Sequence, residues 1–346
     1  MPTAREVSDA YRAALLKREQ AMVKSLIASY KNTYVRLSDK IKALEGEIMA
    51  LPEAERKAWK VMRLGRWKAL RQQVEDELAA FGVIVRDVSQ NGHRESIAAG
   101  LEFALDSVKA RVPAQLLERL LPLWHSLDAA AVESALGFFA EGSPLVAKLN
   151  ALAPDGAALI ERLLTEAVTM GYNPRKWAGA AARGLGQPLP WALNLARTAQ
   201  LQAYRQATMA SYRRNPHIVR GWTWEAAMDS RTCMSCIAMD GTYHSLDEDL
   251  DDHYQGRCSA VPVTASWSEL GFDIEEEEEA RPLARDWFAE QPEAVQRAMF
   301  RNNALYEAWR DGRVTWEQLS KETESDVWGR MLVQATYKDI FPPANP

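Results

Sequence analysis

The sequence contains very little cysteine, with three residues in a chain of 346. An odd number of cysteines cannot all pair, so a complete disulfide framework is not expected. Long apolar runs are missing as well, and no stretch approaches the roughly 20 residues that a membrane-spanning helix needs. Residues 1–10 do not have the pattern of a signal peptide. We therefore expect a protein of a cytoplasm-like compartment that has no membrane partner.

Motifs of the common enzyme classes are also missing. The sequence has no phosphate-binding GxxxxGK loop, no HExxH, no GxSxG and no kinase-like set. The best enzymatic alternative is an HNH-like metal-dependent nuclease, in which His253 would act as general base. Such enzymes need a later Asn or His on the following helix, but His253 is the last histidine and the next asparagine is Asn302. We expect a protein that is not an enzyme.

Acidic residues are absent from residues 167–224, which carry eight basic side chains, whereas residues 225–290 carry 17 acidic residues and four arginines. This contrast indicates a basic surface that faces double-stranded DNA or an acidic partner. In the alternative interpretation, these side chains line a solvated helix face or pair with the acidic segment. The basic residues are Arg175, Lys176, Arg183, Arg197, Arg205, Arg213, Arg214 and Arg220.

The three cysteines that are present lie close together, in the pattern C-x2-C-x16-H-x4-C. Cys233 and Cys236 can both point at one ion because the turn between them folds back on itself. His253 and Cys258 can arrive together on one returning segment and complete four ligands. The spacing therefore predicts a closed, structural zinc site with no open position for water, and His244 is the substitute for His253.

Two other interpretations of the cysteines stay open. In the first, the C-x2-C turn holds no metal and its thiols cap backbone N–H groups, since cysteine often behaves as a small buried apolar residue. In the second, the pair carries redox chemistry.

Several spaced residues around the cysteines follow an order that is found in a known family. They are Asp229, Arg231, Cys233, Cys236, Asp240, Gly241, His253, Arg257, Cys258 and Pro262. This order resembles the signature of the phage head morphogenesis family, the Mu protein F-like minor head proteins of tailed bacteriophages. The chain departs from it at Gly256, where the family often has a cysteine.

The resemblance implies a minor head protein of a tailed phage or prophage, present in the virion or the host cytoplasm. It further implies a place at or near the portal during procapsid assembly, a contribution to DNA delivery, and the portal protein and other head proteins as partners. The alternative from another class is a non-specific DNA-binding protein with a structural zinc knuckle.

The predicted fold is α+β and mainly α, in three consecutive segments. Residues 1–112 should form a long helical hairpin or bundle. An apolar seam runs from Tyr30 to Leu51, a turn follows at Pro52, and the next helix carries Trp67, Leu70, Val74, Leu78 and Phe81 on one face. Asn91-Gly92 should break this helix before another that Pro113 ends.

Residues 113–220 should contain shorter helices and become basic toward their end. The expected breaks lie at Gly142, Pro154-Asp155-Gly156, Gly171 to Pro174 and Pro188 to Pro190, and a last helix should begin at Leu195.

Residues 221–346 should form a knuckle domain with trailing helices. Period-two alternation predicts a strand at Trp222 and Trp224, and these two side chains should pack the sheet onto neighbouring helices. Two further short strands are expected near Tyr243 and after Cys258. Asp229 should close an Asx-type turn, and Arg231 should reach the acidic loop at 247–252. The acidic run 275–279 should be an exposed loop, and Gly312 should separate two helices, the second capped by Thr315.

Overall fold

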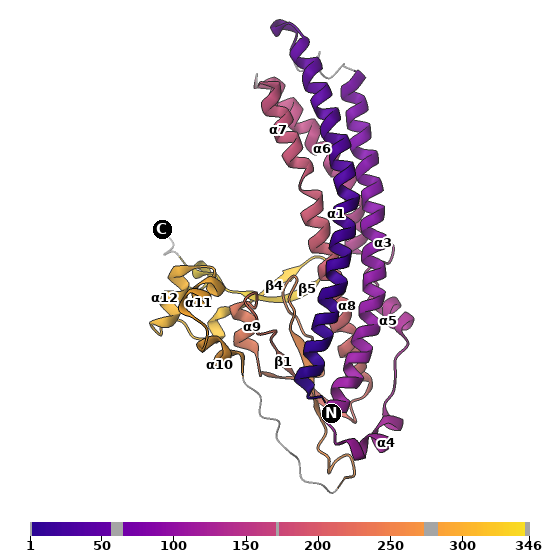
Figure 1. The fold of residues 1–346 in the computed structure, drawn as a ribbon, viewed down its shortest axis with the longest axis vertical. Coiled ribbons are helices and arrows are strands. Elements are labelled where there is room, and N and C mark those ends of the chain that lie inside the picture. The colour runs from indigo at the N-terminus through magenta and orange to yellow at the C-terminus, as the bar shows by residue number, and fades with distance from the viewer. Residues whose placement is uncertain (1, 57–64, 171–172, 273–282, 343–346) are drawn as a thin grey trace. The chain divides into compact units, whose positions relative to one another are not determined.

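The computed structural model describes residues 2–56, 65–170, 173–272 and 283–342 (Figure 1). The fold is α+β and mainly helical, with one three-stranded and one two-stranded antiparallel sheet, which confirms the predicted class. The chain forms two compact units. Unit 1 takes in residues 1–16, 93–136 and 200–346, and unit 2 takes in residues 17–92 and 137–199. These units are not consecutive in sequence, unlike the three expected segments.

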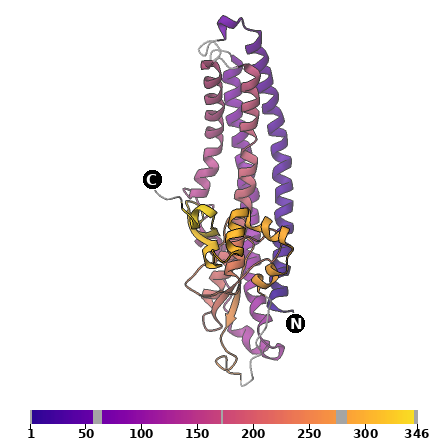
Figure 2. The same ribbon diagram turned by 90° about the vertical axis from the view of Figure 1, so that its left-hand side faces the viewer.

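Unit 2 is a bundle of long helices that run alongside one another (Figures 1 and 2). Its helices are α1 (Ala4–Ala50), α3 (Gly65–Ala110), α6 (Pro144–Thr169), α7 (Pro174–Leu185) and α8 (Pro188–Arg214), of which α1, α3 and α8 also supply residues to unit 1.

The predicted hairpin of α1 and α3 is confirmed. Leu37 and Ile41 of the first seam and Leu78 and Phe81 of the second are buried. The rings of Tyr30 and Phe81 lie 4.6 Å apart across the two helices. Each helix thus buries the apolar stripe that its sequence periodicity places on one face.

Two of the predicted breaks are wrong, because α3 continues through Asn91-Gly92 and α6 continues through Pro154 and Gly156. A glycine inside a helix costs only about 1 kcal/mol relative to alanine, and a proline about 3 kcal/mol. Burial of the surrounding helix faces outweighs these costs. A side chain at Gly156 would overlap that of Leu78, so the glycine also permits α6 to approach α3 closely.

Other boundaries follow the sequence. Gly142 has a φ of +80° before α6. The side chain of Asn173 accepts a hydrogen bond from the backbone N–H of Arg175 and so begins α7, while Gly171 and Tyr172 lie outside the described residues. Helix α8 starts earlier than expected, at Pro188, since proline is well tolerated in a first helical turn.

Unit 1 contains the three-stranded sheet, in the order β2-β1-β3. Its strands are β1 (Val219–Glu225), β2 (Tyr243–Ser245) and β3 (Ser259–Thr264), and the short helix α9 (Met234–Met239) lies between β1 and β2 in the chain. Trp222 and Trp224 are 0% and 1% exposed and belong to one apolar core together with Ile237 and Leu250. The predicted packing role of the two tryptophans is confirmed.

The remaining elements of unit 1 are short. They are α4 (Leu117–Leu120), α5 (Ala129–Leu136), α10 (Ala284–Ala289), α11 (Glu293–Phe300), α12 (Asn303–Arg310), α13 (Tyr337–Ile340), β4 (Ser320–Ser325) and β5 (Gly329–Gln334). Single 3-10 turns occur in unit 1 at Ala114–Leu116, Leu121–Leu123 and Glu317–Leu319, and in unit 2 at Glu53–Glu55.

The segment after Gly312 differs from the prediction. The expected helix behind Thr315 is a single 3-10 turn, and the β4–β5 hairpin follows it. The hairpin is held by distant partners, since the N–H of Leu332 donates to the carbonyl of Asp251 at 2.6 Å. Tertiary contacts therefore override the local helical pattern. The acidic run 275–279 lies outside the described residues.

Candidate metal centre

The C-x2-C motif lies at the start of α9. Cys233 is the N-cap of this helix, and its sulfur accepts a hydrogen bond from the backbone N–H of Cys236 at 3.4 Å. The two sulfurs lie 3.4 Å apart and both side chains are buried, with free thiols. The turn thus presents two sulfurs to one point, as the spacing predicts.

His253 faces this pair from the segment between β2 and β3. Its Nε2 lies 3.2 Å from the sulfur of Cys233 and 3.4 Å from that of Cys236. Its Nδ1 lies 2.8 Å from the carbonyl oxygen of Tyr254, which can only accept, so Nδ1 carries the proton. A metal-binding histidine is commonly oriented in this way, with its second nitrogen on a backbone carbonyl.

Cys258 lies next to the same centre. The candidate ligand atoms form two groups, Cys233–Cys236–His253 and Cys236–Asp252–Cys258, and within each group all atoms lie within 4.8 Å of one another. Cys236 belongs to both groups, so Cys233 and His253 lie on one side of it, whereas Cys258 shares its group with Asp252 rather than with Cys233 and His253. The structure thus places Asp252, which the sequence analysis does not include as a ligand, in the cluster.

His244, the substitute ligand, is not part of the cluster. Its ring stacks on Trp222, with centroids 4.3 Å apart. Its Nε2 lies 2.8 Å from the hydroxyl of Thr242, and its Nδ1 lies 3.2 Å from a carboxylate oxygen of Glu248. This alternative is wrong, because strand β2 points the imidazole at the sheet and both nitrogens already have partners.

Asp252 and Arg205 form a buried ion pair beside the cysteines. Their side chains are 0% and 2% exposed, and Nη2 of Arg205 lies 2.9 Å from Oδ2 of Asp252. The other carboxylate oxygen lies 3.4 Å from the sulfur of Cys236. Asp252 precedes a histidine in sequence, which is the one local signal for it, whereas nothing in the sequence connects it to Arg205.

The electrostatics of the cluster follow from these contacts. The hydrogen bond between the two sulfurs lowers the pKa of Cys233 well below its ordinary value and raises that of Cys236 well above it. Burial raises the pKa of Cys258. Burial opposes protonation of His253, but the charge of Asp252 and the contact with Cys233 outweigh it and raise its pKa to about 9.

The carboxylate of Asp252 stays ionised for a related reason. Burial acts to raise its pKa, but the charges of Arg205 and His253 and the N–H of Cys258 outweigh burial and lower the pKa below its ordinary value.

The donor set suits a metal ion. Thiolate and imidazole ligands favour zinc, and three sulfurs with one nitrogen would leave no open coordination position. The Cys and His groups of this cluster can therefore hold a metal ion. The hydrogen bond from the Cys236 N–H to the Cys233 sulfur also fits a metal-free knuckle.

The residues before the cysteines form the expected turn. Oδ1 of Asp229 accepts a hydrogen bond from the N–H of Arg231 at 2.8 Å, which confirms the Asx-type turn. The ion pair expected between Arg231 and the acidic loop is replaced by a contact with Asp229 at 3.7 Å. Arg257 binds both carboxylate oxygens of Asp229 instead. The guanidinium of Arg257 outweighs burial and lowers the pKa of Asp229 to about 2.

Asp240, Gly241 and Pro262 also have structural positions. The carboxylate of Asp240 accepts hydrogen bonds from the N–H groups of Ala226 and Ala284, both at 2.8 Å. Gly241 has a φ of +83°, which favours glycine. Pro262 pairs with Trp222 in the sheet. These motif residues hold the strands and α9 together around the cysteines.

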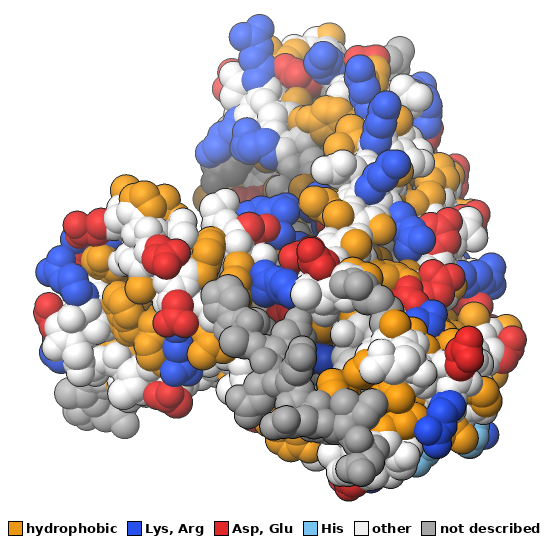
Figure 3. All heavy atoms as spheres, turned by 60° about the horizontal axis from the view of Figure 1, so that its bottom comes forward, with side chains coloured by type: hydrophobic (Ala, Val, Ile, Leu, Met, Phe, Trp, Pro, Cys, Tyr) orange, Lys and Arg blue, Asp and Glu red, His pale blue; other side chains and the backbone are white. Residues whose placement is uncertain are grey.

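The basic residues of 167–224 are divided between the units, and most have acidic neighbours. Arg205 is wrong as a nucleic-acid contact, because its side chain is buried against Asp252. The other ion pairs are Arg175–Glu45, Arg197–Glu19, Arg213–Asp249 and Arg220–Glu269. Pairing with the acidic segment 225–290, one of the open alternatives, therefore occurs at three of the eight positions, Arg205, Arg213 and Arg220, and two further arginines pair with glutamates elsewhere. On the face drawn in Figure 3, acidic and basic side chains lie near one another, with hydrophobic side chains between them.

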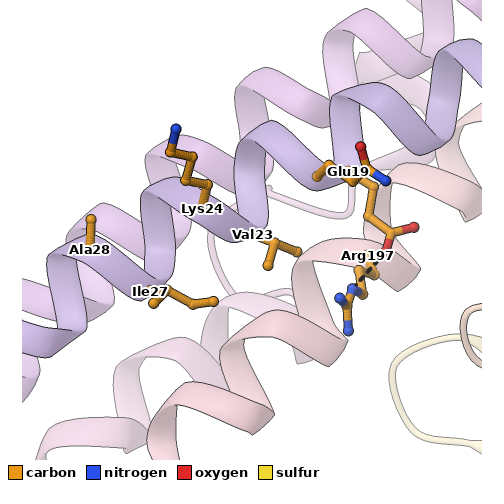
Figure 4. Close-up of a pocket in the computed structure, with 7 residues that line it drawn as sticks. Glu19, Val23, Lys24, Ile27, Ala28 and Arg197 are labelled. Carbon is orange, nitrogen blue, oxygen red and sulfur yellow. Dashed lines mark ion pairs between the residues drawn. The ribbon is translucent and has the colours of Figure 1, made fainter.

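A groove of about 390 Å³ in unit 2 does not have the features of an active site. Figure 4 shows Val23 and Ile27 of α1 pointing toward it and Lys24 pointing away. The single acid on its wall, Glu19, forms an ion pair with Arg197 at 2.9 Å. Among the described residues, the cysteine cluster is thus the stronger candidate.

A comparison with known protein families also points to the part of the chain that contains the cysteine cluster. No helix of the described residues has the length and apolar content required to cross a bilayer. No match was found among curated proteins or solved structures. Residues 158–261 match the family described as phage Mu protein F like protein. This segment runs from within α6 to within β3 and contains all four expected ligands. The resemblance noted in the sequence is confirmed over residues 158–261, the segment that matches this family.

Proposed function

We propose that the chain is a minor head protein of a tailed phage or prophage, that it acts at or near the portal during procapsid assembly, and that it contributes to DNA delivery. The family match over residues 158–261 carries this proposal. The portal protein and other head proteins are the proposed partners.

The site supports a structural rather than an enzymatic role. Three of the four expected ligands are buried, since Cys233, Cys236 and Cys258 are each 4% exposed or less, and the side chain of His253 is 22% exposed. A closed site of three thiolates and one imidazole offers no coordination position for a substrate or an activated water. We propose that zinc stabilises the knuckle, so that the surface which meets other head proteins keeps one shape.

The contacts of His253 in the cluster do not favour an HNH-like nuclease. A general base must reach the proton that it removes. Nε2 of His253 instead faces two sulfurs, and its Nδ1 donates to the carbonyl of Tyr254.

The test uses the phage or prophage that encodes the chain. With the gene deleted, we expect heads that lack DNA or fail to assemble, and procapsids from which this protein is missing. Supplying the wild-type gene should restore normal heads. Its protein product should co-purify with the portal protein. A Cys233→Ser, Cys236→Ser double variant should fail, while Gly46→Ala should succeed, because an added methyl group at Gly46 meets no atom within 4 Å. Normal heads without the gene would contradict the proposal.

DNA binding is tested separately by gel shifts at increasing salt. Contacts with phosphates should weaken steeply as salt rises. Strong salt-dependent binding by the isolated protein, combined with normal heads in the deletion strain, would favour the DNA-binding alternative. Since most of the basic side chains already have acidic partners, we expect at most weak binding.

A further inference from the structure

The carboxylate of Asp252 contacts both residues that deliver the second half of the cluster. Its Oδ1 accepts a hydrogen bond from the N–H of His253 at 2.9 Å, and its Oδ2 accepts one from the N–H of Cys258 at 3.1 Å. The loop 252–258 is thus closed around one buried carboxylate. The two N–H groups belong to the two ligands on the returning segment.

Arg205 of α8 holds the same loop at a second place. Its guanidinium donates to Oδ2 of Asp252 at 2.9 Å, to the carbonyl of Asp252 at 3.4 Å, and to the carbonyl of Gly256. One rigid donor fork therefore connects the beginning of the loop, its far side and α8.

Gly256 leaves the room that the carboxylate needs. A side chain at this position would overlap all three terminal atoms of Asp252. The neighbouring Gln255 has a φ of +56°, so the backbone turns tightly here. A cysteine at position 256 is therefore incompatible with the present position of Asp252, and the loop cannot provide a ligand there.

The oxygens of Asp252 are already engaged. Oδ2 accepts from Arg205 and from the N–H of Cys258, and Oδ1 accepts from the N–H of His253 and from the thiol of Cys236. Burying two charges is costly, so an ion pair of this kind is weak evidence for stability alone. Its contacts with the loop that carries two ligands give it a more specific role.

We propose that Arg205 and Asp252 are positioning residues that preform the 252–258 loop for zinc, and that Asp252 is not itself a ligand. This inference rests on the proposed zinc site and is independent of the role in head assembly. In this role, the buried ion pair orients the metal ligands through hydrogen bonds, as residues behind the ligands do in many metal sites.

The experiment compares two variants of the full chain, Asp252→Asn and Glu225→Gln. The second is a matched control, because Glu225 is also buried in unit 1 and binds Arg12 at 2.9 Å. Zinc affinity is measured by competition with a chromophoric chelator, and the ligand set by the absorption spectrum of the cobalt(II)-loaded protein. We expect Asp252→Asn to weaken zinc binding by about 10–100-fold. Glu225→Gln should leave the affinity at the wild-type value.

The cobalt spectrum separates positioning from ligation. At saturating cobalt, Asp252→Asn should show the wild-type spectrum, because the coordinating atoms are the same. A changed spectrum would make Asp252 a ligand and overturn the proposal. Unchanged zinc affinity would overturn it too. If the wild-type chain bound neither zinc nor cobalt, the metal site itself would fail, an outcome distinct from both.

A second measurement does not depend on a variant folding. In metal-free wild-type protein, the amide hydrogens of His253 and Cys258 should be protected from exchange, since both donate to the buried carboxylate. Arg205→Lys, which keeps the charge but loses the fork, should reduce this protection. Free exchange of both amides in folded, metal-free wild type would show that the loop is not preformed.

Discussion

The two units of this protein stabilise their interiors in different ways. Unit 2 buries apolar stripes such as those with Leu37 and Leu78, and its ion pair Arg36–Glu77 lies at the surface, where Arg36 is 51% exposed. Among the described residues, every buried Asp, Glu or Arg belongs to unit 1. They are Arg205, Glu225, Asp240 and Asp252.

This difference shows where each unit is sensitive to change. An apolar stripe tolerates substitutions that keep its volume, because burial is not directional. A buried charge needs one particular partner at one particular distance, and losing it leaves the other group without compensation. We therefore expect changes in unit 2 to alter stability alone, and changes in unit 1 to alter both stability and the cysteine cluster.

The largest effect should come from removing a buried aromatic side chain in each unit. Trp224→Ala and Phe81→Ala should each lower the free energy of unfolding by about 3–5 kcal/mol, because both side chains are 1% exposed. Only Trp224→Ala should also reduce the zinc content, because Trp224 and Cys258 belong to the same buried core cluster. Denaturant titration and elemental analysis measure the two quantities. Equal zinc content in both variants would break the distinction between the units.

Metal removal should affect one unit alone. If zinc is present at about 1,000 times its dissociation constant, a chelator should lower stability by about 4 kcal/mol. Amide exchange followed by mass spectrometry should then accelerate in peptides that cover residues 233–264 and stay constant in peptides from residues 70–90. If the chelator changed neither the melting temperature nor the exchange pattern, the metal-free knuckle would be supported instead.

Adding a methyl group should have opposite effects on stability at two glycines of unit 2. Gly156→Ala should destabilise the protein by about 1–3 kcal/mol, because the added carbon overlaps the side chain of Leu78. Gly46→Ala meets no atom within 4 Å and should stabilise α1 by up to about 1 kcal/mol. Thermal melts of both variants measure these shifts, and zinc content should not change in either. A stabilising Gly156→Ala would disprove the close helix contact.

The smallest effect should be a dependence on pH in unit 1. Because the pKa of Asp229 is lowered to about 2, its ion pair with Arg257 contributes stability above the ordinary pKa and loses it as the pH falls through about 2. Asp229→Asn should therefore melt earlier than wild type at pH 7, and the difference should disappear near pH 2. Arg257→Gln should show the same trend. A difference that is independent of pH would exclude the ion pair as its cause.

Much of unit 2 could be predicted from the sequence. The seam that contains Leu37 and Ile41 repeats with a helical period, and such repetition has one physical meaning, a buried face. The errors at Gly92 and Pro154 share one cause. Glycine and proline act locally as breakers, but the burial of a long helix face outweighs a cost of about 1–3 kcal/mol.

For the candidate site, the sequence predicted that His253 approaches the C-x2-C turn, but not the contacts that surround these residues. The C-x2-C turn and the segment with His253 and Cys258 are close in sequence, so spacing alone could bring them together. The direction of His244 depends on the pairing of β2 with β1, which places its ring on Trp222. Spacing does not contain that information.

The sequence by itself determined the helical hairpin, the strands around the two tryptophans and the approach of His253 to the Cys233–Cys236 turn. These features depend on the periodicity of apolar residues and on short separations along the chain, and both can be read directly from the sequence. The tertiary structure alone decided that Arg205 is buried against Asp252, 47 residues away, and that Gly256 leaves space for that carboxylate. A buried ion pair is specified by where two distant segments meet, so no local pattern can show it.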